Sequence, residues 1–126
     1  HQTRWLLTRN TSGKPVYLFT DELRCPTWVN TLAQALLELA AGEYTGMINI
    51  ASPEPLNRWE FGMKMLAMLG LKPSPNVGPA LQAESGLIRP ANLTLDVSRA
   101  QHQLRTPLTT VDEAIKCINS GNRRTL

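Results

Sequence analysis

Two arginines, Arg24 and Arg89, lie in segments expected to be loops, and a guanidinium fixed beside a proline, as at Arg89, is a rigid donor for phosphate oxygens. Arg24 opens the run Arg-Cys-Pro-Thr-Trp, which reaches Trp28 between an expected strand and an expected helix. Arg89 directly precedes Pro90, after a glycine-containing loop. A guanidinium matches phosphate geometry, and ligands of open α/β sheets lie beyond the carboxyl ends of the strands. We therefore predict that Arg24, Trp28 and Arg89 face a ligand. The alternatives are a capping turn with Trp28 in the core and an ordinary surface position for Arg89.

Sequence motifs for catalysis and cofactor binding are not found. Dinucleotide binding in a Rossmann fold needs a glycine-rich turn between a strand and a helix, whereas the nearest glycine pair, Gly42 and Gly46, follows an expected helix. Neither tyrosine is followed four residues later by the lysine that would lower its pKa for proton transfer. A hydrolase triad could be drawn from Ser98, His102 and Asp112, but no nucleophile-elbow sequence surrounds the serine. We predict no catalytic, cofactor-binding or metal-binding residue in this chain.

The composition is that of a globular chain. Its 126 residues are 42% hydrophobic and 18% charged, and the formal net charge is +3. The basic residues are scattered, which argues against a nucleic-acid partner. The longest apolar stretch is far below the about 20 residues that span a bilayer, so we expect no membrane partner. Cys25 and Cys117 form no close pair; we expect two free, buried thiols in a cytoplasmic protein, with a single distant disulfide as the alternative.

Hydrophobic periodicity and turn residues predict short elements in alternation. Helices are expected at residues 4–9 before Gly13, 29–40 before Gly42, 57–70, from 96 or 98 to 104, and 110–121. Strands are expected at residues 16–20, 47–51 and 93–95, and loops at residues 21–26 and 71–88. Capping boxes mark two helix starts, from Asn57 to Glu60 and from Thr110 to Glu113.

Strands that alternate with helices indicate parallel α/β packing. Only two of the expected strands are convincing, whereas a typical sheet has about five or six. The sheet is therefore thin for an independent domain, which favours a fragment of a larger protein. The first residue, His1 in place of the usual Met, is a further hint in the same direction.

Four segments resemble the dTDP-4-dehydrorhamnose reductases, a family of extended short-chain dehydrogenases/reductases. They are Arg24 to Val29 with Leu32-Ala33, similar to Pro-Thr-x-Val-x-Asp-Leu-Ala; residues 46–52, similar to Gly-x-Tyr-His-x-Ala-Gly; Arg58 to Phe61, similar to Tyr-Glu-Phe; and Arg89-Pro90 with residues 95–99, similar to Arg-Pro-x-x-x-x-Leu-Asp-x-Ser-Lys. Each motif alone is weak, but four in register over residues 14–118 are fairly specific. The sequence departs from the family at Asn30, Asn49 and Ser52, which leaves the exact substrate open.

The resemblance implies an α/β fold with a partial Rossmann-type sheet edge, a small substrate-binding lobe and helices on the faces. Residues 1–126 would form a single C-terminal substrate-binding domain without the N-terminal NAD(P)-binding half. The implied ligand is a sugar nucleotide such as a dTDP-sugar. NAD(P) would serve the parent enzyme only, and this chain alone would be inactive. Arg89 would contact the nucleotide diphosphate, Asn92 would lie near the ribose, and Arg24 and Trp28 would lie at the pocket rim.

Two other functions stay open. The same segments resemble the regulatory beta subunit of methionine adenosyltransferase, a relative that serves as a binding subunit, so a non-enzymatic regulatory or interaction protein is the alternative. An unpaired sheet edge invites pairing with another chain, which predicts a homodimer. The missing N-terminal half or a partner protein would otherwise complete the fold.

Overall fold

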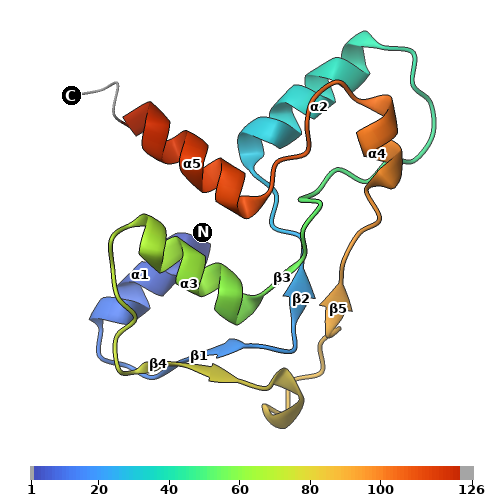
Figure 1. The fold of residues 1–126 in the computed structure, drawn as a ribbon. Coiled ribbons are helices and arrows are strands. Elements are labelled where there is room, and N and C mark those ends of the chain that lie inside the picture. The colour runs from blue at the N-terminus through green and yellow to red at the C-terminus, as the bar shows by residue number, and fades with distance from the viewer. Residues whose placement is uncertain (1, 123–126) are drawn as a thin grey trace. The chain divides into compact units, whose positions relative to one another are not determined.

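The computed structural model describes residues 2–122, which form two compact units. Within that range the first unit comprises residues 2–24 and 56–93, and the second comprises residues 25–55 and 94–122. The elements in chain order are α1 (Gln2–Thr11), β1 (Val16–Phe19), β2 (Leu23–Arg24), α2 (Val29–Ala41), β3 (Leu56–Asn57), α3 (Arg58–Met68), β4 (Val77–Ala80), the short 3₁₀ helix η1 (Gln82–Glu84), β5 (Asn92–Leu93), α4 (Ser98–Gln103) and α5 (Val111–Asn122) (Figure 1).

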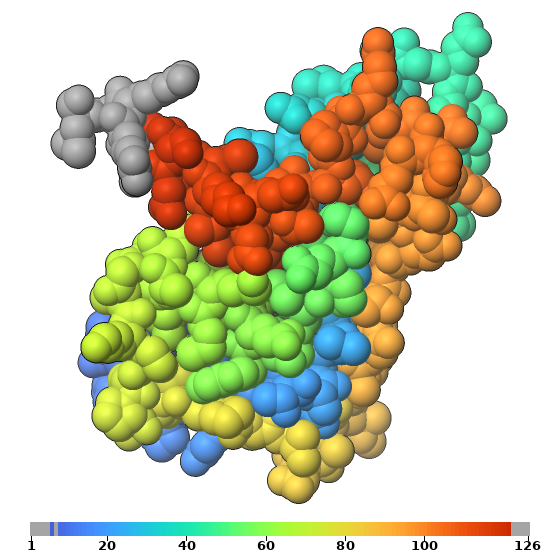
Figure 2. Space-filling view, in the orientation of Figure 1, coloured from blue at the N-terminus to red at the C-terminus, as the bar shows by residue number. Residues whose placement is uncertain are grey.

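The first unit packs two helices against a pair of parallel strands. β1 pairs with β4 in a register that runs from Val16 opposite Val77 to Phe19 opposite Ala80. Both α1 and α3 lie on the same side of this strand pair (Figure 1). In the space-filling view, α3 and the residues that follow it form most of the visible face of this unit and cover much of β1 (Figure 2). The buried aliphatic residues of the unit are Leu6, Val16, Leu18, Leu56, Met65, Leu66 and Val77.

Gly62 allows α3 to approach β1 and α1 closely. A Cβ atom added at Gly62 would lie 2.5 Å from Leu18 Cδ1 and 3.6 Å from Leu6 Cδ2. Glycine in the middle of a helix costs about 1 kcal/mol relative to alanine. The close approach explains why a glycine stands here all the same.

A three-stranded sheet in the same unit has the order β3-β2-β5. β2 runs antiparallel to β3 and parallel to β5, so Arg24 is paired with Leu56 on one side and with Leu93 on the other. These three residues form one row across the sheet. Each of them is also the point at which the chain leaves the first unit or returns to it.

The second unit has a small core around α2 and α4. Ala35, Ala100 and Leu104 are buried, and Leu39, Ile48, Ile50 and Leu108 pack against them. The buried face of α2 is formed by Thr31 and Ala35, and the Thr31 and Thr109 hydroxyls form a hydrogen bond of 2.6 Å. Three aliphatic side chains of the same helix are largely exposed: Val29 (69%), Leu36 (53%) and Leu37 (72%).

The expected α/β class is confirmed, and so are the local helix signals. Asn57 Oδ1 accepts a hydrogen bond of 2.8 Å from the backbone N–H of Glu60, and Glu60 Oε2 accepts one of 3.0 Å from the N–H of Asn57. Thr110 and Glu113 form the second capping box. Gly70 ends α3 with a φ of +67°, and the N–H groups of Gly70 and Leu71 donate to carbonyls of the last helical turn, as in a Schellman motif.

The predicted strand at residues 47–51 is wrong. The segment is extended but pairs with no strand among residues 2–122. Ile48 and Ile50 instead pack on the core of the second unit. Side chains supply the hydrogen bonds, because Arg99 Nη1 donates to the Met47 carbonyl and Asn49 Nδ2 donates to the Asp96 carbonyl. Hydrophobic burial therefore occurs without a sheet.

Two predicted loops contain strands, and the cysteine prediction is half right. β2 lies inside residues 21–26 and β4 inside residues 71–88. β4 contains Gly78 and Pro79, which resemble loop residues in the sequence, but a proline is tolerated on an edge strand. Both cysteines are free as expected; Cys25 is only half-buried and Cys117 is exposed, so their predicted burial is wrong. Within residues 2–122, no helix is long and apolar enough to cross a bilayer.

Candidate functional site

A buried carboxylate, Glu22, lies at the centre of the charged residues of the first unit. The residue is 0% exposed and stands in the connection from β1 to β2. Arg24 Nη2 lies 3.1 Å from Glu22 Oε1, and Arg58 Nε donates to Glu22 Oε2. Oε1 accepts no hydrogen bond of normal geometry from the described residues, so its contact with Arg24 is chiefly electrostatic. Such a carboxylate needs these opposite charges to remain ionised in the interior.

Asp21, next to Glu22, fixes the segment that leads toward Arg89. Its carboxylate accepts hydrogen bonds from the backbone N–H groups of Gln82 (2.7 Å) and Ala83 (3.1 Å). These bonds, above all the one from Gln82, lower the pKa of Asp21 from its ordinary value. The start of η1 is thereby attached to the β1–β2 connection.

Arg24 holds the segment that follows Arg89. Its Nη1 atom donates to the carbonyl of Leu23 at 2.6 Å and to that of Ala91 at 3.3 Å, and Nη2 donates to the carbonyl of Pro90 at 3.0 Å. The backbone N–H of Leu23 also donates to the Ala91 carbonyl. The guanidinium is thus engaged by protein groups on β2 and on the residues just before β5.

Arg58 is placed by the capping box that begins α3. It is the first residue of the helix, and its side chain is 33% exposed. Burial lowers the pKa of Arg58 from its usual value, and the positive charge of Arg89 lowers it further. A guanidinium stays protonated even so.

The cluster carries an excess of positive charge. Arg24 and Arg58 share a single buried carboxylate, Glu22, and Arg89 adds a further positive charge, which acts on Arg58. Arg89 is exposed, and among the described residues no carboxylate partner or hydrogen bond is recorded for its guanidinium. Guanidinium groups with this freedom are suited to binding phosphate.

Of the four residues predicted to bind substrate, three lie in the first unit. Arg24 and Asn92 belong to adjacent strands, where Leu23 is paired with Asn92, and Arg89 lies three residues before Asn92. Trp28 belongs to the second unit, where it is half-buried and forms the N-cap of α2. It makes no side-chain capping bond there.

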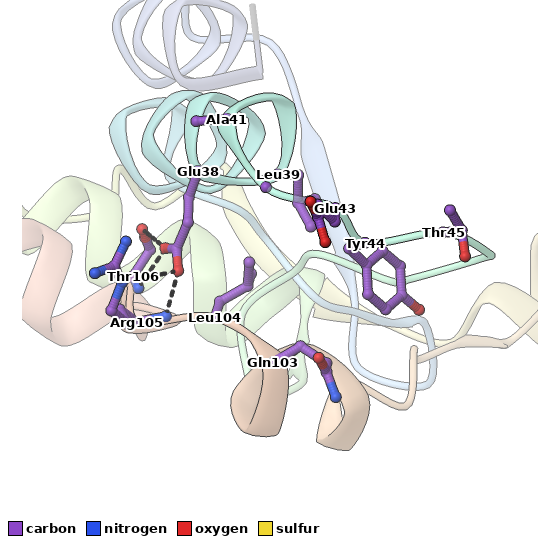
Figure 3. Close-up of a pocket in the computed structure, with 11 residues that line it drawn as sticks. Glu38, Leu39, Ala41, Glu43, Tyr44, Thr45, Gln103, Leu104, Arg105 and Thr106 are labelled. Atoms are coloured by element: carbon purple, nitrogen blue, oxygen red, sulfur yellow. Dashed lines mark hydrogen bonds and ion pairs between the residues drawn. The ribbon is translucent and has the colours of Figure 1, made fainter.

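The second unit contains a hollow of about 720 Å³ between the end of α2, residues 42–45 and residues 103–106. Glu38 points toward Arg105 and Thr106 in this hollow (Figure 3). Its carboxylate accepts from the N–H of Arg105 (2.7 Å) and from the N–H and hydroxyl of Thr106 (2.8 and 2.7 Å). These hydrogen bonds, led by that from Arg105, lower the pKa of Glu38 to about 2. We interpret Glu38 as a structural anchor because protein donors already occupy its oxygens.

Glu22 and Glu38 were not singled out by the sequence motifs, and Arg58 entered only as the first residue of the segment to Phe61 that resembles the family. Arg58 follows a capping asparagine and reads as an ordinary first residue of a helix. Glu22 lies in a segment rich in charged residues, and its burial depends on β2 pairing with both β3 and β5. The one usable signal is the spacing of Glu22 and Arg24, which places both side chains on one face of a strand.

Within residues 2–122, no glycine-rich turn joins a strand to a helix. A dinucleotide's pyrophosphate is bound where a glycine-rich turn joins a parallel strand to a helix. Here β1 leads to β2, and β2 leads to α2 through Cys25–Trp28, which contains no glycine. Within the same residues no group of three His, Cys, Asp or Glu side chains could hold a metal ion.

Comparison with known proteins identifies the family. The family model described as the RmlD substrate binding domain matches residues 3–121, so the chain belongs to that family. The fold is similar to that of dTDP-4-dehydrorhamnose reductase from Bacillus anthracis, crystallised with NADP (TM-score 0.79, 14% identity, 94% of this chain and 42% of that chain). A hypothetical dTDP-4-dehydrorhamnose reductase from Sulfolobus tokodaii is 29% identical (TM-score 0.71, 90% of this chain and 40% of that chain).

A further relative was crystallised with nucleotide sugars. MoeE5, in complex with UDP-glucuronic acid and NAD, has a TM-score of 0.64 and 22% identity over 100% of this chain and 42% of its own. This chain therefore spans about two fifths of the length of the solved structures it matches. No curated protein matches the sequence significantly.

Proposed function

We propose that this chain is the sugar-nucleotide-binding part of an NAD(P)-dependent reductase, and that Arg89 binds the diphosphate of the ligand. Membership of the substrate binding domain family supports the ligand class. The UDP-glucose and UDP-glucuronic acid complexes of MoeE5, which shares the fold, support it further. We assign no step of hydride or proton transfer to residues of this chain, so those steps belong to other parts of the parent enzyme.

The observation that carries the proposal is the uncompensated positive charge at Arg89. The Pro90 carbonyl beside it is held by Arg24, which limits the movement of the segment. A guanidinium that is exposed and without a carboxylate partner among the described residues can bind a phosphate without first breaking an ion pair.

The test is titration of the chain with dTDP-glucose and UDP-glucose by isothermal titration calorimetry. Replacing Arg89 by alanine removes a charge-assisted contact worth about 1.5–3 kcal/mol, so we expect binding at least about tenfold weaker. Arg105→Ala serves as the control, because that arginine is 94% exposed and belongs to the second unit. Affinity that is equal in Arg89→Ala and the control would remove the support for this site.

The other predicted residues take distinct roles in the proposal. Asn92 stands beside Leu23 on the next strand and lies near the ribose, as the family resemblance implies. Arg24 acts on the ligand through the Pro90 and Ala91 carbonyls that it holds. A ligand contact of Trp28 stays a prediction from the family resemblance, and Trp28→Ala is expected to weaken sugar-nucleotide binding in the same titration.

One observation favours the alternative of a non-enzymatic interaction subunit. Val29, Leu36 and Leu37 expose aliphatic surface on α2, and exposed apolar patches mark interaction sites. This function predicts a stable complex with a partner protein and no response to sugar nucleotides. The same titration separates the two functions. Leu37→Lys is expected to weaken binding of the partner protein only if α2 forms the interface.

A further inference from the structure

Arg58 is an arginine for which the proposed function has no role. A guanidinium has five N–H donors in one plane. Its Nε donates to Glu22, and no other hydrogen bond or ion pair of Arg58 is recorded among the described residues. The Nη donors remain available, and the side chain is 33% exposed. Arg58 can therefore bind a ligand while it keeps its contact with the buried carboxylate.

Arg58 and the backbone beside Arg89 are connected through the same buried group. Glu22 contacts Arg24 at 3.1 Å and also accepts from Arg58, while Arg24 donates to the carbonyl of Pro90, the residue after Arg89. A chain of contacts thus leads from Arg58 to the backbone beside Arg89. Because Glu22 is fully buried, moving Arg58 away would leave its carboxylate with the Arg24 ion pair alone, at an energetic cost.

We propose that Arg58 is a second ligand for the diphosphate, that Arg58 and Arg89 bind it jointly, and that Glu22 positions Arg58 for this contact. The inference rests on the proposed function. A nucleoside diphosphate sugar carries one negative charge on each of its two phosphates, so Arg58 and Arg89 would together supply one positive charge for each phosphate. The negative charge of Glu22 neutralises one positive charge in the interior. The exposed N–H donors of Arg58 and Arg89 then remain for the ligand.

The decisive variant is the double substitution Glu22→Gln with Arg58→Gln. It removes one charge of each sign, so the net charge of the cluster is unchanged. The Arg58 contact is lost together with the ion pair between Glu22 and Arg24, and Arg58→Lys, which keeps Glu22 and Arg24, separates the two effects. We expect UDP-glucose and dTDP-glucose to bind at least about tenfold more weakly. Arg58→Lys keeps the charge but lacks the planar donors, and we expect binding about threefold to tenfold weaker. Circular dichroism establishes that each variant is folded.

A matched control is the double substitution Glu38→Gln with Arg105→Gln, which removes a carboxylate and an arginine of the second unit. It is expected to bind like the unaltered chain. Phosphorus NMR of the saturated complexes provides a second readout, because losing a guanidinium shifts a phosphate resonance, whereas a purely structural change leaves both in place. If Glu22→Gln/Arg58→Gln does not fold, the affinity and the phosphorus spectrum of Arg58→Lys test the role of Arg58 instead.

The outcomes separate the two proposals. Affinity within about twofold of the unaltered chain in both Arg58 variants, with a loss in Arg89→Ala, overturns the role of Arg58 and leaves the proposed function in place. A chain that binds neither nucleotide sugar overturns both. A loss in both Arg58 variants and in Arg89→Ala, with unchanged binding in the control, supports the joint contact.

Discussion

At the scale of single residues, the same amino acid has different tasks in this protein. Arg24 donates to three backbone carbonyls, whereas Arg89 has no recorded partner of this kind among the described residues. Both were predicted from the sequence as ligand-facing arginines. Their neighbours in space distinguish them, because Arg24 lies on β2, between β3 and β5, and Arg89 lies on an exposed segment.

Arg24→Lys tests the structural task of Arg24. Lysine keeps the positive charge beside Glu22 but cannot reach the Leu23, Pro90 and Ala91 carbonyls together. We expect the free energy of unfolding to fall by about 1.5–3 kcal/mol, measured by urea denaturation. Arg105→Lys, at a 94% exposed side chain, should change it by less than about 0.5 kcal/mol. Equal stability of the two variants would argue against this task.

Glu38 links stability to pH. Its pKa is lowered from 4.5 to about 2 in the folded chain. A lowered carboxyl pKa contributes stability that is present above the unfolded value and is lost as the pH falls through the folded value. The stability difference between the unaltered chain and Glu38→Gln should therefore be largest above pH 4.5 and shrink toward pH 2. Urea denaturation across this range measures it, with Glu43→Gln as an exposed control; a difference that is constant with pH would contradict the assignment.

At the scale of elements, the contact between α3 and β1 depends on the absence of a side chain at Gly62. Gly62→Ala places a Cβ 2.5 Å from Leu18 Cδ1. Overpacking of a buried contact costs about 1–3 kcal/mol, and the gain in helix propensity is about 1 kcal/mol. We expect a net loss of about 1 kcal/mol in the free energy of unfolding.

The partner residue supplies the control for this prediction. Leu18→Val removes the δ carbon that would collide, so Gly62→Ala should cost less in that background than in the unaltered chain. A double-mutant cycle measures the difference. Equal costs in both backgrounds would show that Leu18 is not the obstacle.

Helix boundaries could be predicted from the sequence far better than the sheets. The capping boxes at Asn57 and Thr110 depend on residues three positions apart, so local sequence determines them. β2 has only two residues, and it exists because β3 and β5 flank it. Residues 47–51 show the opposite error. Their apolar side chains are typical of a strand, but they pack on the core of the second unit without pairing with a strand.

In the candidate site, too, local sequence signals mark some residues and not others. Arg89 and Asn92 were proposed from the sequence because a proline and a family motif mark them, and their ligand contacts stay a prediction. Glu22 and Arg58 are far apart in sequence, and neither residue has a neighbour that signals a contact. Their meeting depends on the pairing of β2 with β3, which periodicity over two residues cannot reveal.

At the scale of the whole molecule, self-association remains a prediction. Within the described range β1 and β4 pair only with each other, so each has an unpaired edge. Pro79 removes a donor from the β4 edge, which leaves β1, with its exposed Tyr17, as the better edge for pairing. We expect a concentration-dependent dimer in light scattering, weakened by Tyr17→Lys. A monomer at high concentration would contradict it, and a loss caused by Leu37→Lys alone would assign the contact to α2.

The row formed by Arg24, Leu56 and Leu93 suggests how a shorter protein that contains only the first unit could be designed. Arg24 and Leu56 face each other on antiparallel strands, so a two-residue turn such as Asn-Gly could join them in place of residues 25–55. The chain could then stop just after Leu93, the third residue of the row. Such a minimal hairpin-closed protein would retain Glu22 and all three arginines of the cluster in about half the original length.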